Sequence, residues 1–135
     1  LKKLLDTQNF PFSYWVNQEI EKIRNQENTP IDFFTDFIHR GFYYEQLERY
    51  YQFFPVENIL VIEHRELKNN RISTLRKIEQ FLNISYVDWN TINLDDKFVS
   101  QYNVKLPSDI RNKLKAFFKP YNEKFYKLIK RNFDW

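Results

Sequence analysis

Apolar residues recur three or four positions apart along most of this 135-residue chain, a spacing that is typical of amphipathic helices. Six segments show the pattern and are expected to be helical. They are residues 13–25, 30–40, 43–54, 71–82, 110–118 and 121–129. Polar residues mark several of their ends. Ser13 is placed to cap the first helix, Gly41 to adopt the left-handed conformation after the second, and Pro120 to separate the last two.

One apolar run departs from this pattern. Residues 59–62 read Ile-Leu-Val-Ile shortly after Pro55, which predicts a strand at about 58–63 that is buried on both faces. No other segment is a good partner for it, although a buried strand needs one for its backbone hydrogen bonds. Its partners come from a missing upstream segment or from another chain, or the run is helical after all. We favour the missing segment.

Composition narrows the class of protein. Hydrophobic residues make up 42% and charged residues 29%, as in a soluble globular protein, and the single glycine favours helices over a turn-rich β fold. The absence of cysteine excludes disulfides and thiolate zinc sites, and His39 and His64 lack metal-ligand spacing, so we expect no metal. The chain starts at Leu1 and has no methionine, so we expect a processed or truncated form. The sequence does not determine the cellular compartment, and we slightly favour a bacterial cytoplasm over the Golgi lumen.

Six motifs in order resemble one enzyme family. They are Gly41-Phe42-Tyr43, Phe53-Phe54-Pro55, Asn58 to Ile62, Leu75 to Leu82, Leu114 to Tyr126 and Phe133-Asp134-Trp135. Together they cover residues 39–135 and resemble the C-terminal portion of sulfotransferases, especially the heparan-sulfate type and bacterial carbohydrate relatives.

The resemblance implies an α/β, P-loop-like fold that is mostly helical here, with the 58–63 strand in a central parallel sheet. Residues 1–135 would be a single domain or part of one. The implied donor is 3′-phosphoadenylyl sulfate (PAPS), whose sulfuryl group moves to a hydroxyl or amine of a carbohydrate-like acceptor, without metal. The phosphate-binding loop and the catalytic base are expected upstream of Leu1, so the isolated chain would lack the chemistry.

The resemblance also suggests ligand-binding residues. Ser13 matches a family serine at a helix start that binds the 3′-phosphate, although Leu5 stands where the family has an arginine. Lys105, and with it Lys97, lies in a loop that would fold over the nucleotide. Arg40 and Tyr43 are candidates for binding the acceptor. Each also has a structural interpretation: a helix cap for Ser13, a surface cation for Lys105, a helix-end charge for Arg40 and a core residue for Tyr43.

Glu63 and His64 are the candidate acid–base pair within the chain. They follow the predicted strand, at the edge of an open α/β sheet where ligands bind. No nucleophile accompanies them. Two rival functions remain: a non-catalytic helical protein-interaction module, and a basic nucleic-acid-binding domain. The second is disfavoured because the cations look spread over every helix and interleaved with acids.

Overall fold

The structure is a computed structural model that describes residues 11–27, 36–95 and 105–135. The chain divides into two units. The described part of the first, here called the aromatic unit, comprises residues 11–27, 36–50, 106–133 and 135. The second unit comprises residues 51–95, 105 and 134.

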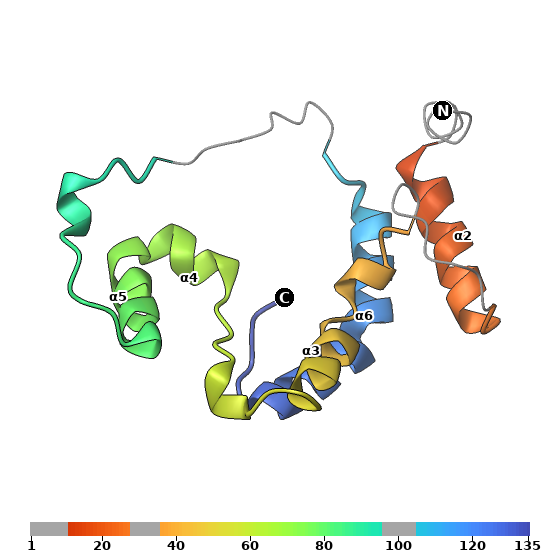
Figure 1. Ribbon diagram of the computed structural model, residues 1–135. Coiled ribbons are helices and arrows are strands. Elements are labelled where there is room, and N and C mark those ends of the chain that lie inside the picture. The colour runs from red at the N-terminus through yellow and green to blue at the C-terminus, as the bar shows by residue number, and fades with distance from the viewer. Residues whose placement is uncertain (1–10, 28–35, 96–104) are drawn as a thin grey trace, which may run out of the picture. The chain divides into compact units, whose positions relative to one another are not determined.

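The aromatic unit is built from helices α2 (Phe12–Arg24), α3 (Tyr43–Tyr51) and α6 (Ser108–Ile129), with a 3₁₀ helix η1 (His39–Gly41) between the first two (Figure 1). One cluster forms its core. The buried members are Val16, Ile20, Ile38, Phe42 and Ile110. Phe42 lies at the centre of the aromatic contacts, with its ring centroid 4.5 Å from that of Tyr121 and about 6 Å from those of Phe117 and Phe118. Tilted and edge-on aromatic pairs of this kind add to the free energy of area burial.

The predicted first helix is confirmed, but two predicted helix ends are wrong. Pro11 is the N-cap of α2 and makes no side-chain capping bond, so Ser13 lies inside the first turn. Gly41 has no positive φ. A side chain there is excluded by packing, because a Cβ on Gly41 would come within 2.7 Å of the Phe118 ring.

The predicted helix over 30–40 lies partly outside the described residues. Where the structure resumes, residues 36–41 form a turn and η1, and Phe37 is exposed. The expected helix over 43–54 ends at Tyr51, and no residue of α3 is fully buried.

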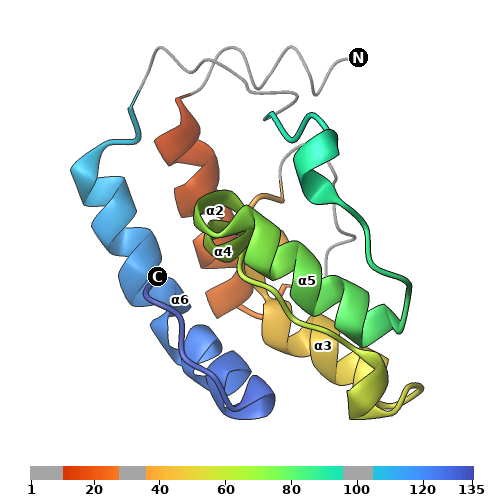
Figure 2. The same ribbon diagram turned by 90° about the vertical axis from the view of Figure 1, so that its left-hand side faces the viewer.

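Helix α6 corrects the prediction of two C-terminal helices, because it continues through Pro120. Proline lacks the amide for one backbone hydrogen bond, which bends a helix more often than it ends one when both halves are held by packing. Figure 2 shows α6 as one long helix that changes direction part-way along. None of the helices in the described ranges is long and apolar enough to cross a membrane.

The second unit contains a 3₁₀ helix η2 (Val56–Asn58), helices α4 (His64–Asn69) and α5 (Arg71–Leu82), and a 3₁₀ helix η3 (Trp89–Thr91). The predicted bounds of α5 are confirmed, whereas α4 was not among the six predicted helices. Asn83 ends α5 in the left-handed conformation, which asparagine tolerates better than most residues. Trp89 in η3 is half-buried.

The predicted strand at 58–63 is not confirmed. Residues 59–63 form no regular element, and the structure shows no strand anywhere in its described ranges. The backbone is nevertheless extended at Ile59 (φ −125°, ψ 114°) and Glu63 (φ −75°, ψ 133°). A strand is defined by hydrogen bonds to a neighbour, and the described residues supply none. The central sheet therefore remains an expectation from the family resemblance.

Candidate functional site

The start of α2 carries Ser13, the residue expected to bind the 3′-phosphate. Ser13 is half-buried in the first turn, which contains no acidic residue. The Tyr14 amide donates to the Pro11 carbonyl oxygen, while the amides before it have no partner further back in the helix. Such a turn suits an anion, because helix N-termini combine free amides with the positive end of the helix dipole.

Glu19, further along α2, holds the turn that leads into η1. The side chain is only 3% exposed. Its Oε1 accepts hydrogen bonds from the Ile38 and His39 amides, both at 2.9 Å, and its Oε2 accepts from the Ile38 amide at 2.8 Å. His39 Nδ1 lies 3.1 Å from Oε1, so an ionised Glu19 requires the proton to be on Nδ1. A buried carboxylate is thus satisfied by donors from a segment nineteen and twenty residues away.

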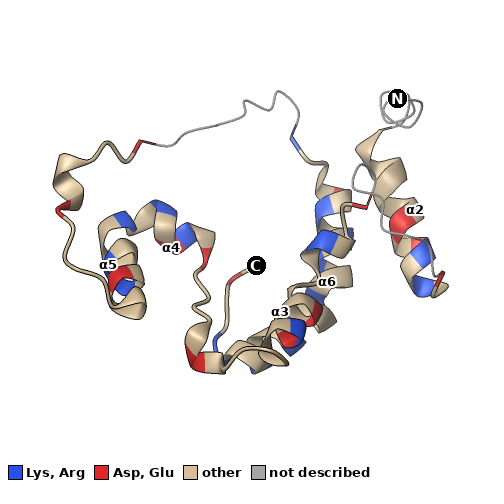
Figure 3. Ribbon diagram, viewed as in Figure 1, with Lys and Arg blue, Asp and Glu red and all other residues tan. Residues whose placement is uncertain are grey.

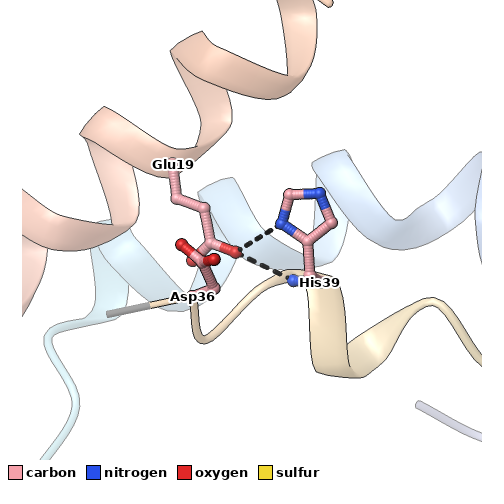
Figure 4. A group of neighbouring side chains, drawn as sticks. All are labelled: Glu19, Asp36 and His39. Carbon is pink, nitrogen blue, oxygen red and sulfur yellow. Dashed lines mark hydrogen bonds and ion pairs between the residues drawn. The ribbon is translucent and has the colours of Figure 1, made fainter. Parts of the chain in front are cut away.

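Asp36 completes a cluster with Glu19 and His39, which Figure 4 shows side by side. One potential ligand atom from each residue lies within 4.8 Å of the other two, a spacing that could hold a metal ion. Glu19 and Asp36 also line a cavity of about 170 Å³, together with Tyr14 and Lys22. Both Glu19 oxygens already accept hydrogen bonds from amides, and the positively charged Lys22 lines the same cavity. We therefore interpret the cluster as a structural contact in which Glu19 holds the turn at residues 38 and 39, and we call this contact the Glu19 clamp.

The second unit contains a comparable arrangement around Glu79 in α5. Arg76 Nη1 donates to both Glu79 oxygens, at 2.9 and 2.7 Å, and to the Val87 carbonyl oxygen at 2.7 Å. The Val87 amide donates back to Glu79 Oε1 at 2.9 Å. Hydrogen bonds from Arg76 and then from the Val87 amide lower the pKa of the Glu79 carboxyl, against the opposing effect of desolvation. This network ties the segment after α5 back to the helix.

The sequence patterns identified neither glutamate as a structural residue. A signal was present, because each glutamate lies on the apolar stripe of its helix. Glu19 is three residues after Val16, and Glu79 is four after Leu75. An acid at such a position is either exposed at the edge of the stripe or buried with donors, and here both are buried with donors.

The structure places the acceptor-binding candidates on neighbouring elements of the aromatic unit. Arg40 is exposed in η1, and its carbonyl oxygen accepts a hydrogen bond from Gln46 Nε2. Tyr43 begins α3, and its ring contacts those of Phe125 and Trp135 at 5.9 and 5.7 Å. Tyr43 is 47% exposed, so its interpretation as a core residue is only partly right.

The remaining candidates lie in the second unit. Lys105 is exposed, and Lys97 falls outside the described residues. Glu63 is the N-cap of α4 without a side-chain capping bond, and His64 is the first residue of that helix. Glu63 lies 3.8 Å from the Arg65 guanidinium. The pair is adjacent at one helix end, but no described contact gives it a nucleophile.

Comparison with known proteins gives a family. Residues 6–91 match the sulfotransferase domain. The chain belongs to the sulfotransferase family. It is 32% identical over 96 residues to the membrane-associated sulfotransferase kil1 of Dictyostelium discoideum, covering 71% of this chain and 20% of that protein. It is 24% identical over 117 residues to human heparan sulfate glucosamine 3-O-sulfotransferase 5, covering 73% of this chain and 34% of the relative.

The region that matches the sulfotransferase domain differs from the region covered by the sequence motifs. The motifs covered residues 39–135, whereas the sulfotransferase domain match begins at residue 6 and therefore takes in Ser13 and Glu19. It also includes Arg40, Tyr43 and the Glu63–His64 pair but ends before Lys105 and α6. The chain spans between a fifth and about a third of the length of these relatives.

Proposed function

We propose that this chain is part of an enzyme that transfers a sulfuryl group from PAPS to a hydroxyl or amine of a carbohydrate-like acceptor. The observation that carries the proposal is the match of residues 6–91 to the sulfotransferase domain. Relatives named as sulfotransferases, one of them acting on heparan sulfate glucosamine, support the reaction and the acceptor class. The single glycine leaves no glycine-rich phosphate loop in this chain, so its part is to support binding.

Ser13 would bind the 3′-phosphate of the donor. Its hydroxyl and the first amides of α2 offer donors to an anion, and no acidic side chain competes in that turn. The Glu19 clamp would hold α2 against the turn that carries Arg40, the candidate for the acceptor side. Lys105 would add a charge to the nucleotide phosphates. Metal plays no part in this scheme.

Residues 59–63 would complete the enzyme's central sheet. They are extended at both ends and carry the apolar side chains that a parallel strand buries on both faces. The catalytic groups are not assigned, and Glu63 and His64 are candidates because they would lie at the carboxyl end of that strand.

The experiment is binding of 3′,5′-ADP to the full-length gene product, measured by calorimetry. Ser13→Ala should weaken binding about tenfold or more, because a hydrogen bond to a charged group contributes about 1.5–3 kcal/mol. Adenosine 5′-monophosphate, which lacks the 3′-phosphate, should bind the variant and the unmodified protein equally. Ser73→Ala, in the first turn of α5, is the matched control and should change neither affinity.

Two results would contradict the proposal. If the full-length protein does not bind 3′,5′-ADP, PAPS is not the donor. If the Ser13→Ala variant binds 3′,5′-ADP as tightly as the unmodified protein, Ser13 does not bind the 3′-phosphate. Transfer of labelled sulfate from PAPS to a glycan tests the reaction itself.

A second candidate is a protein-interaction module without catalysis. Exposed apolar side chains in the second unit favour it, among them Phe53 and Leu82. The same binding experiment separates the two functions, since an interaction module has no reason to distinguish 3′,5′-ADP from adenosine 5′-monophosphate.

A further inference from the structure

The positive charge of the protein is concentrated in one element. Residues 108–131, which are α6 and the two residues after it, carry eight lysines and arginines against two acidic residues. The rest of the chain carries thirteen cations against sixteen acids and is therefore acidic. Figure 3 shows basic residues along α6. Cations occur on every α-helix of the described ranges, as the sequence indicated, but α6 carries a larger net positive charge than the others.

Three of these residues form a row along α6. Arg111, Lys115 and Lys119 recur every fourth residue, so they lie along one side of the helix, and all three are exposed. Their Cα atoms span about 12 Å at the usual rise per residue. We call these three residues the basic row.

The basic row is not explained by local stability. Like charges four residues apart destabilise a helix, and within the described ranges none of the three has an ion-pair partner. Lys127, Lys130 and Arg131 are different, because cations near a helix C-terminus interact favourably with the helix dipole. Lys113 and Lys124 are also engaged, Lys113 with Asn17 Oδ1 and Lys124 with the Tyr44 ring.

The side of α6 next to the basic row is fixed by packing. Ile110 and Phe125 are buried, and Phe117, Phe118 and Tyr121 contact the core of the aromatic unit. The basic row is therefore carried on a firmly packed helix. Because these aromatic rings of α6 pack in the core, we expect a ligand at the basic row to be bound mainly by the charges of the row.

We propose that the basic row binds an anionic polysaccharide, which makes the acceptor of the proposed reaction a sulfated or carboxylated glycan chain. This inference rests on the proposed function for the choice of a glycan over another polyanion. Phe117 and Phe118, the rings of α6 near the row, pack against the core of the aromatic unit, which agrees with that choice because single-stranded nucleic acids are bound by cations together with aromatic stacking platforms. A row of cations along about 12 Å can contact several anionic groups of one chain at once.

The test is binding of heparin by the full-length gene product over a range of salt concentrations. The triple variant Arg111→Gln, Lys115→Gln, Lys119→Gln should bind at least about tenfold more weakly near 0.1 M salt, with a shallower salt dependence, because fewer counterions are released. The matched control Arg49→Gln, Lys68→Gln, Lys77→Gln removes the same charges from exposed positions outside α6. It should keep nearly all of the affinity. Circular dichroism should show the same helix content in all three proteins.

Three outcomes would overturn the inference. The basic-row variant could bind heparin as tightly as the unmodified protein, or the control could lose as much affinity as the basic-row variant. Single-stranded DNA of equal charge could also bind more tightly than heparin through the same three residues, which would assign the row to nucleic acid. The proposed function can fail independently of this inference. If the protein binds heparin through the basic row but transfers no sulfate from PAPS, the row binds an anionic polysaccharide and the proposed enzyme activity is wrong.

Discussion

The two units of this chain are stabilised by different means. The aromatic unit has a cluster of fully buried apolar residues centred on Phe42, with Glu19 holding its turn. In the second unit, the described residues that are fully buried are Thr74 and Glu79, both polar. Phe53, Phe81 and Leu82 are exposed there. The first unit therefore has an apolar core of its own, whereas the second relies on a polar network and leaves apolar surface in contact with water.

This difference agrees with the family assignment. A unit that exposes apolar side chains and an extended apolar segment is stabilised when other parts of a protein cover them. The regions that match this chain make up 20% of the Dictyostelium relative and 34% of the human relative, so most of each relative lies outside the match. We therefore expect the second unit to gain more stability than the aromatic unit from the rest of a full-length sulfotransferase.

Replacement of a central aromatic residue should separate the two units most clearly. Phe42→Ala should lower the free energy of unfolding of the aromatic unit by about 3–5 kcal/mol, since Phe42 is 5% exposed and surrounded by rings. Phe81→Ala, at 37% exposure in α5, is the matched change and should have a much smaller effect in this chain. Hydrogen exchange of amides in α2 and α5 reports each unit separately. Equal losses from the two variants would contradict the difference between the units.

The sequence predicted the helices better than it predicted what holds them. Periodic apolar residues located α2 and gave the bounds of α5, because their stripes are regular. Gly41 and Pro120 were misread, because local rules for glycine and proline were overruled by tertiary packing. Phe118 excludes a side chain at Gly41, and contacts on both sides of Pro120 keep α6 continuous.

The candidate site shows the same limit. Ser13 was found because a serine near a helix start is a local signal, although the structure moves it from the cap into the first turn. The Glu19 clamp depends on amides nineteen residues later in the chain, which no local pattern reveals. The concentration of charge in α6 could be counted from the sequence, but the exposure of the basic row and its lack of ion pairs could not.

After Phe42→Ala, loss of the Glu19 clamp should have the next largest effect on the stability of the aromatic unit. Glu19→Gln replaces one accepting oxygen by an NH₂ group. At the Oε1 position this group would leave the His39 amide without its acceptor, and at the Oε2 position it would leave the Ile38 amide with Oε1 alone, so either orientation removes a hydrogen bond as well as the charge. Loss of hydrogen bonds to a charged group should lower the stability of the aromatic unit by about 1.5–3 kcal/mol. Chemical denaturation followed by tryptophan fluorescence measures it. Glu21→Gln, two residues away and exposed, is the control, and an equal loss there would show that the clamp contributes nothing.

The Glu79 network should have the smallest effect, confined to the second unit and dependent on pH. Because Arg76 lowers the pKa of Glu79 in the folded chain, folding favours the ionised carboxyl. Its stabilisation is therefore present at neutral pH and is lost as the pH falls below the ordinary glutamate pKa towards the lowered one. The Glu79→Gln variant should be less stable than the unmodified chain at pH 7. The two should be nearly equal in stability once the pH is low enough to protonate Glu79 in the folded chain. Hydrogen exchange of the Val87 amide, which donates to Glu79, is the measurement. A difference between the two proteins that stays constant from pH 7 down to pH 3 would show that the charge of Glu79 does not hold this segment.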